Sequence, residues 1–269
     1  MDTATQNSAV LAGSLKAEPR PCDRSSEEDY RDGSGVLNST LRASRSVINS
    51  QQWSFYEHHF ASARLQHYLD ERGNDQLTAM QLYEWNTAVS AAFWESLSFF
   101  EVALRNAIDR ELTSIHADKG RSGHWIFDEA KELGRDRFGR DQHKQPYKDV
   151  AIAIDRVKRN GKPVSPEQVI SEISFGFWHQ MVSKGQLFLW PDLVATFPNT
   201  PNRSQKTVQE PVARLRDFRN RIGHHHRIWS IDIDARYEDI LTVARYLDAD
   251  LASWIDSRSR VVELLAQKP

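Results

Sequence analysis

Residues 77–115 of the chain read LTAMQLYEWNTAVSAAFWESLSFFEVALRNAIDRELTSI. This stretch is apolar for most of its length and contains no proline or glycine, the residues that most often interrupt a helix. It predicts one long helix, or two helices in line. No pair of strands with an intervening turn signal is found in the rest of the chain, so the sequence predicts an all-α fold.

Other segments repeat apolar residues at steps of three and four, the period of a helix that buries one face. One of them has a clear start signal, because Ser165 is a favoured N-cap, Pro166 suits the first helical position and Gln168 follows three residues after the cap. The further helices are expected at residues 53–69, 123–133, 146–161, 165–182, 206–222, 235–247 and 249–266.

The N-terminal part of the chain has a different composition. Residues 1–50 are rich in Ser, Asp, Glu, Arg and Gly and show no sustained apolar period. Such a segment buries too little apolar surface to offset the entropy of ordering it. We therefore predict a polar, disordered tail over residues 1–50, with a short helix at most near residues 36–41, and one helical domain over residues 51–269.

The bulk composition restricts the possible functions. The chain carries 35 Lys and Arg against 37 Asp and Glu, a net charge of −2, so anion binding must depend on a local patch. The single cysteine, Cys22, rules out an internal disulfide and a thiolate zinc cluster. No apolar run has the length of a membrane span, and no basic region of a signal peptide precedes the first apolar residues. These features predict a cytoplasmic protein without a membrane partner, metal or cofactor.

Residues 214–229 read RLRDFRNRIGHHHRIW and combine basic residues, three histidines and a tryptophan. On a helix over residues 206–222, Arg219 falls in the middle of an apolar stripe, whereas Arg214 and Arg221 project elsewhere and are expected to be solvated. A guanidinium within such a stripe is costly unless it is paired, hydrogen-bonded or open to a cleft. The stripe consists of Val208, Val212, Leu215 and Ile222.

The end of the same helix brings a second basic side chain close in sequence. Gly223 suits a C-terminal cap, so we expect the helix to fray there. His224 follows directly, five residues after Arg219. In a frayed last turn the two side chains can converge on one small ligand.

The long helix contains a similar anomaly. Glu101 and Arg105 lie within its apolar stripe, in the order that favours an intrahelical ion pair. One interpretation is a buried ion pair that bridges two helices. Another is that Glu101 orients Arg219 or His224 without itself touching a substrate. The stripe consists of Trp94, Leu97, Leu104, Ile108 and Leu112.

The motif and its surroundings resemble a known family. The pattern Arg219-Asn220-x-x-x-His224 has the Arg-polar-x3-His form of the HEPN superfamily. Four segments in order, WNTAVSAAFWESLSFFEVALRNAIDREL, ISEISFGFWHQMV, LWPDLVATFP and LRDFRNRIGHHHRIW, resemble the Abi-like (abortive infection) family within it. The likeness covers about residues 55–265. It implies a HEPN-like helical bundle with additional helices, and RNA cleavage by Arg219 and His224 with Asn220 at the polar position.

The resemblance also implies a biological setting. It predicts a metal-independent endoribonuclease of a phage-defence or toxin–antitoxin system, with a possible antitoxin or defence-system partner and a homodimer that has the motif at its interface. The alternative is a non-catalytic module that binds RNA or assembles with other proteins. Some HEPN toxins are silenced by modification of a Tyr two residues after the motif His. That position is His226 here, so this form of control is not expected.

The residue types suit cleavage of RNA without a metal. Histidine transfers protons near neutral pH, and the planar fork of arginine binds two phosphate oxygens. Asn220 is a candidate for holding the sugar or a phosphate oxygen, while His225 and Arg221 are candidate RNA contacts. One histidine leaves the second proton-transfer role unfilled, and two chains that meet at the motif would supply it.

Metal binding by the three histidines is the main rival interpretation of the motif. It is disfavoured because adjacent histidines point in diverging directions and no cysteine or HExxH pattern accompanies them. Trp178 and Trp229 are interpreted either as core residues or as platforms for RNA bases.

Overall fold

The computed structural model describes residues 50–269, with side chains from Gln52 onward. The predicted tail and its short helix lie outside these residues. Gln52–Pro269 form one compact unit, which is helical and contains no strand in the described range, so the all-α prediction is confirmed. The elements are α2 Ser50–Phe60, α3 Ser62–Glu71, α4 Gln76–Asp118, η1 Trp125–Phe127, α5 Gln145–Arg159, α6 Pro166–Glu172, α7 Phe175–Met181, η2 Lys184–Leu189, α8 Trp190–Leu193, η3 Val194–Thr196, α9 Gln205–Gly223, α10 Ile233–Leu247, α11 Ala249–Arg258 and α12 Val261–Ala266.

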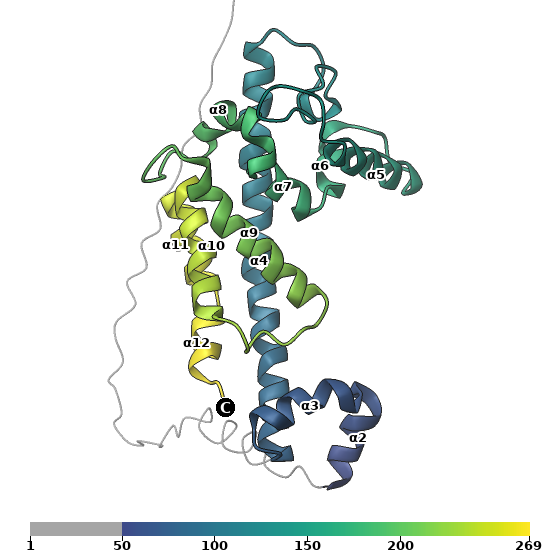
Figure 1. Ribbon diagram of the computed structural model, residues 1–269, viewed down its shortest axis with the longest axis vertical. Helices are drawn as coiled ribbons and strands as arrows, with labels where there is room; N and C mark the ends of the chain where they lie inside the picture. Colours follow the sequence, from purple (N-terminus) through teal and green to yellow (C-terminus); the bar gives the residue numbers. More distant parts are fainter. Residues whose placement is uncertain (1–49) are drawn as a thin grey trace, which may run out of the picture. The chain divides into compact units, whose positions relative to one another are not determined.

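Helix α4 is the element on which most others pack. It runs unbroken for 43 residues, about 65 Å at the usual rise, and Asp75 caps its start by accepting a hydrogen bond from the Leu77 amide at 3.1 Å. Of the two predicted alternatives, one long helix or two helices in line, the structure has the single helix. Helices α3, α7, α8, α9, α10, α11 and α12 all contact it (Figure 1).

Aromatic side chains join α4 to its neighbours in the core. The buried ring of Phe93 meets Phe218 of α9 edge-on at 4.8 Å and Tyr237 of α10 at 6.2 Å. Two helical turns further along α4, the ring of Phe100 meets that of Phe175 of α7 at 6.1 Å. Edge-to-face pairs of this kind stabilise a core beyond the area they bury. The position of α9 relative to α4, which decides where Arg219 lies, is fixed by this packing.

The segment after α9 is also anchored on α4. The buried carboxamide oxygen of Asn86 accepts a hydrogen bond from the Ile228 amide at 2.8 Å. Nearby, Trp85 donates from its indole nitrogen to the Leu264 carbonyl at 2.6 Å. The chain that follows the three histidines is therefore held against α4.

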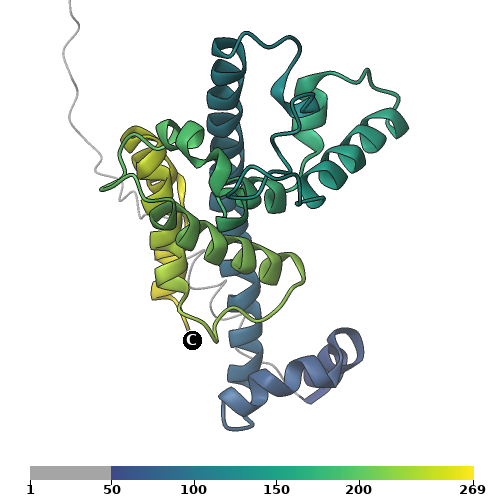
Figure 2. The same ribbon diagram turned by 45° about the horizontal axis from the view of Figure 1, so that its top comes forward.

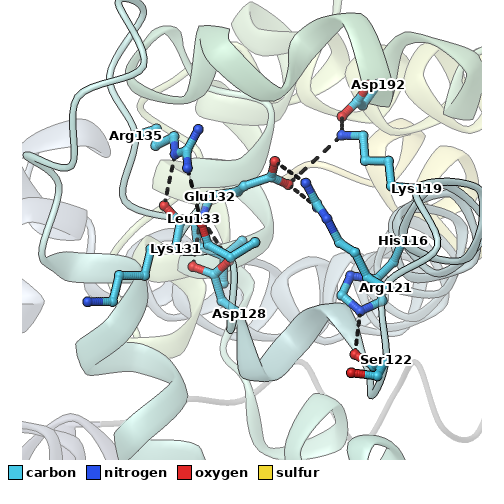
Figure 3. A network of polar contacts seen from close by, with 11 residues as sticks. His116, Lys119, Arg121, Ser122, Asp128, Lys131, Glu132, Leu133, Arg135 and Asp192 are labelled. Carbon is cyan, nitrogen blue, oxygen red and sulfur yellow. Dashed lines mark hydrogen bonds and ion pairs between the residues drawn. The ribbon is translucent and has the colours of Figure 1, made fainter.

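The predicted helix over residues 123–133 is wrong, apart from the short turn η1. The reason is local hydrogen bonding, because the Asp128 carboxylate accepts from the amides of Glu132 and Leu133 at 2.7 and 2.9 Å. Side chains that bond the backbone in this way compete with a helix. Arg121 then binds the Glu132 carboxylate through two hydrogen bonds, at 2.6 and 2.7 Å (Figure 3).

A second ion pair extends this network to α8. Lys119 lies 2.7 Å from Asp192 of α8 and 3.9 Å from Glu132 (Figure 3). These contacts tie the loop after α4 to the end of α4 itself. Charged side chains therefore determine the conformation of this region. The prediction of a helix rested on its apolar residues alone and did not include these contacts.

Three other predicted helices are interrupted. Residues 53–69 form α2 and α3, which are separated at Ala61, where φ is 62°. Ser165 caps α6 as predicted and accepts from the Gln168 amide at 3.4 Å, but the helix stops after Glu172 and α7 begins anew. Residues 249–266 form α11 and α12, with extended backbone at Ser259 between them. No helix among the described residues is both long and apolar enough to cross a membrane.

Candidate functional site

Helix α9 places the sequence motif at its C-terminal end. Arg219 lies in its final turns, and His224 follows its last residue, Gly223, as predicted. The buried face of α9 includes Pro211 and Phe218 in addition to the predicted stripe. Arg219 is not among the buried residues of α9. Its side chain is 33% exposed, which leaves the guanidinium accessible from one side.

The predicted fraying at Gly223 is wrong. The helix stays regular through Gly223, and the residue in the left-handed conformation is His225, with φ at 55°. The His225 amide donates to the Ile222 carbonyl at 2.9 Å, and the His226 amide donates to the Arg221 carbonyl at 2.8 Å. This pair of bonds is the Schellman motif, which normally places glycine at the left-handed position. A histidine there is strained by about 1 kcal/mol or more.

Gly223 is the last residue of α9 and lines the same hollow as Trp94 of α4. A Cβ atom at this position would lie 3.8 Å from the nearest ring carbon of Trp94, an ordinary van der Waals contact, so the packing does not require a glycine. Trp94 keeps 39% of its surface exposed, so it forms part of the molecular surface beside the motif.

Arg219 is held between an aromatic ring and a carboxylate. Its guanidinium carbon lies 4.9 Å from the centre of the Trp94 ring, and its Nε lies 3.7 Å from Oε2 of Glu101. The Nε is buried and has no hydrogen-bond partner, and no other hydrogen bond joins this guanidinium to a described residue. A guanidinium has five N–H donors. Arg219 is therefore positioned by a cation–π contact and an ion pair, with its donors unused.

Glu101 forms an ion pair with Arg219 that bridges α4 and α9. This contact agrees with both interpretations of Glu101, so its role in orienting Arg219 stays a prediction. Burial raises its pKa above the ordinary value of 4.5, while the positive charges of Arg219 and Arg105 pull the pKa down. The expected intrahelical pair with Arg105 is not formed, because the Nε of Arg105 donates to Asn106 at 3.2 Å. Glu101 thus neutralises Arg219 across the helix interface rather than its own neighbour.

His224 is exposed at the end of α9. Its amide donates to the Asn220 carbonyl at 2.9 Å, and its ring centre lies 5.8 Å from that of His226. No hydrogen bond or ring contact joins the His224 side chain to Arg219 within residues 50–269. The two side chains therefore do not contact each other directly, and their convergence on one ligand stays a prediction.

The remaining residues in and near the motif differ in whether their polar side chains are hydrogen-bonded. The Asn220 carboxamide is exposed and makes no hydrogen bond with the described residues. Arg221 is half-buried and donates through Nη2 to the Arg227 carbonyl at 2.7 Å. Arg214, which we expected to be solvated, is exposed but pairs with Asp239, with Nε donating to Oδ2 at 2.9 Å. Only Asn220 among these three has a free polar side chain.

The three histidines do not gather around a common point. His225 is exposed, and its carbonyl accepts a hydrogen bond from Nη1 of Arg64 on α3 at 2.7 Å. Within the described part of the chain, no group of three or more His, Cys, Asp or Glu side chains is placed to hold a metal ion. Of the two tryptophans, Trp178 is fully buried in the core. Trp229 is half-buried and lies between Tyr68 and Arg227.

Two residues at the site were missed from the sequence. Trp94 was assigned to the buried stripe of α4, yet it is the ring on which Arg219 rests. Its spacing of seven residues from Glu101, two helical turns, was the available signal that both lie on one face. Arg64, in contrast, gave no signal, because its contact with the His225 carbonyl depends on how α3 folds back onto the end of α9.

Comparison with known proteins gives one family. The family model described as Abi-like protein matches residues 46–230, more than half of the chain. No curated protein and no solved structure matches. The match includes α4, the segments around α7 and α8, and the whole of α9 with its three histidines. The chain therefore belongs to the Abi-like protein family and is a protein of the abortive-infection type.

Proposed function

We propose that this protein is a metal-independent endoribonuclease of the HEPN type, which acts in phage defence or in a toxin–antitoxin system. The observation that carries the proposal is the state of Arg219. Its guanidinium is fixed by Trp94 and Glu101, and none of its hydrogen-bond donors is used by a described residue. A fixed and unsatisfied guanidinium at the protein surface is suited to a phosphate group.

The contacts of Arg219 favour binding of a phosphate group, whose negative charge is greater in the transition state of cleavage than in the bound substrate. Trp94 covers one face of the guanidinium and leaves its edge free, and donors in this plane match two oxygens of a phosphate. Glu101 offsets part of the cost of burying the cation without occupying its donors, because 3.7 Å is too long for a hydrogen bond. Arg219 can therefore stabilise the charge that develops on the phosphorane during cleavage.

His224 and Asn220 would supply the other roles. Cleavage needs a base that removes the proton of the 2′-hydroxyl and an acid that protonates the leaving 5′-oxygen. His224 is exposed at the helix end, where its ring can reach a bound nucleotide, and the free carboxamide of Asn220 lies one turn before it. Attack by the 2′-hydroxyl leaves a 2′,3′-cyclic phosphate, and this step requires no metal-bound water.

A second chain would complete the site. The Arg219 and His224 side chains make no contact within the described part of one chain, and each chain offers one motif histidine for two proton transfers. Trp94 and Val102 on α4 are 39% and 44% exposed, so apolar surface lies next to Glu101. Exposed apolar surface of this kind favours association. We propose a homodimer in which two motifs face each other across a two-fold axis.

The alternative function is a non-catalytic module that binds RNA or assembles with an antitoxin or another defence protein. The lack of a contact between the His224 side chain and Arg219 among the described residues favours it, because no proton donor is then held beside the guanidinium in an isolated chain. The two functions differ in a simple way: an RNA-binding module leaves the RNA intact.

Substitution at the motif tests the enzymatic function directly. We expect Arg219→Ala and His224→Ala each to lower the rate of RNA cleavage by about 100-fold or more, because each removes a group needed in the transition state. Arg219→Lys should restore little activity, since an ammonium lacks the planar fork. The wild type should be equally active with and without a chelator and should leave 2′,3′-cyclic ends. Activity that chelation abolishes and a divalent ion restores would refute the mechanism.

Association through α4 gives a second test. We expect the wild type to sediment as a dimer at micromolar concentration, and Val102→Glu to sediment as a monomer with little RNase activity. The introduced carboxylate would be buried next to Glu101, where two like charges repel. Val262→Glu is the matched control, because Val262 is 59% exposed on α12 and is not near the motif. A wild-type monomer that cleaves RNA at its full rate contradicts the shared site.

The role of Glu101 can be separated from its effect on stability. Burial raises the pKa of Glu101, so its carboxyl group binds a proton more tightly in the folded state than in the unfolded state. Protonation of Glu101 therefore stabilises the fold at low pH. This stabilisation is lost as the pH rises through the pKa that Glu101 has in the folded state. We therefore expect Glu101→Gln to gain stability relative to the wild type as the pH rises above 4.5. The same variant should cleave RNA more slowly, because Arg219 loses its ion-pair partner. Loss of stability at neutral pH, or unchanged cleavage, would show that Glu101 has only a structural role.

A further inference from the structure

Two adjoining hollows lie beside the motif, where α3 meets the end of α9. Helix α3 crosses near the N-terminal end of α4 (Figure 2). The first hollow, of about 950 Å³, is lined by α2, α3, α4 and the end of α9. The second, of about 450 Å³, is lined by α3 and the chain from Arg221 to Arg227. Both include Arg64, Tyr68, His225 and His226, so they form one continuous feature, which we call the α3–α9 groove.

The α3–α9 groove is positively charged although the chain as a whole is not. Its two linings include three arginines, four histidines and one acidic residue, whereas the whole chain has a net charge of −2. The acidic residue, Glu95, is already paired with Arg260 at 2.7 Å. The arginines are Arg64, Arg221 and Arg227. A local cluster of cations in a near-neutral chain indicates an anionic ligand.

The arginines of the α3–α9 groove retain free donors. Arg64 is exposed and uses Nη1 to hold the His225 carbonyl. Arg221 uses Nη2 on the Arg227 carbonyl, while its Nε is buried without a hydrogen-bond partner among the described residues. These bonds fix the directions of both guanidinium groups. They also hold His225 in its left-handed conformation, which needs support from outside the helix.

Aromatic side chains line the other part of the α3–α9 groove. The Tyr83 ring lies 5.3 Å from Phe60 and 5.1 Å from Tyr68, and all three line the larger hollow. Trp94 lines it as well and is partly exposed. Unpaired bases stack on such rings, whereas the bases of an RNA duplex are stacked within the helix and cannot reach them. The combination of cations and aromatic rings therefore suits a single strand.

We infer that the α3–α9 groove binds a single-stranded segment of RNA next to the cleaved bond, with phosphates at Arg64 and Arg227 and an unpaired base against Tyr83 and Trp94. The inference rests on the proposed function for the identity of the ligand, and it specifies which form of RNA is recognised. The groove adjoins the motif directly, because Trp94 and Gly223 both line it and the Trp94 ring also contacts Arg219. A strand that lies in it would continue onto Arg219.

The test uses the full-length His224→Ala protein, so that RNA is bound without being cleaved. Fluorescence anisotropy measures its affinity for a short labelled single strand and for a duplex of the same sequence, over a range of salt concentrations. We expect Arg64→Ala/Arg227→Ala to weaken binding of the single strand about tenfold or more. Loss of two phosphate contacts should reduce the slope of log affinity against log salt by about 1.4. Tyr83→Leu should weaken binding about fivefold or more with an unchanged slope.

Arg156→Ala/Arg159→Ala is the matched control, because it removes two exposed arginines of α5, which lies outside the α3–α9 groove. Its affinity and slope should equal those of the parent, and thermal unfolding should show that all variants are folded. The inference fails if the Arg64 and Arg227 variant keeps the parent's affinity and slope. It also fails if the duplex binds as tightly as the single strand, or if polyglutamate competes better than RNA.

A parallel cleavage assay separates this inference from the proposed function. If the wild type does not cleave RNA but the groove variants lose binding, the endoribonuclease proposal fails and the α3–α9 groove stands as an RNA-binding site. If the wild type cleaves RNA and the groove variants bind and cleave it equally well, the proposed function stands and the inference is wrong.

Discussion

Burial of α4 against helices from both ends of the chain is the constraint on which the rest of the structure depends. Helices α3, α7, α9, α10 and α12 all contact it, and its largest side chains, Phe93 and Phe100, are fully buried. A helix covered on so many sides leaves little surface for function. Trp94 and Val102 of α4 keep exposed apolar surface, and the end of α9 lies beside the first of these. The position of the candidate site follows from where the packing on α4 is incomplete.

Stability is given up at this site in three places. Glu101 is charged in surroundings that raise its pKa, and His225 adopts a backbone conformation that costs about 1 kcal/mol or more for a residue with a Cβ atom. Arg219 is half-buried without a hydrogen bond from a described residue. Packing alone would favour apolar side chains and a glycine at these positions. A phosphate group that accepts hydrogen bonds from Arg219 would account for this arrangement.

Much of the fold was predictable, because the signals involved are local. Residues 77–115 lack helix breakers, and Ser165 has the hydrogen bond that an N-cap requires. The failures also have physical causes. The Asp128 side chain bonds the backbone and prevents a helix, and the left-handed residue after α9 is His225 rather than a glycine. The roles of Trp94 and Arg64 depend on contacts between helices that are distant in sequence, so the motif could be found without the residues that position it.

The central claim is that Arg219 binds the phosphate at which RNA is cleaved. The most direct measurement is a crystal structure of the His224→Ala protein with a single-stranded RNA that is methylated at every 2′-hydroxyl and so cannot be cleaved. The account predicts a phosphate with two oxygens within hydrogen-bond distance of the Arg219 guanidinium, while Trp94 and Glu101 keep their places. RNA bound elsewhere on the protein, with Arg219 in contact only with Trp94 and Glu101, would contradict it.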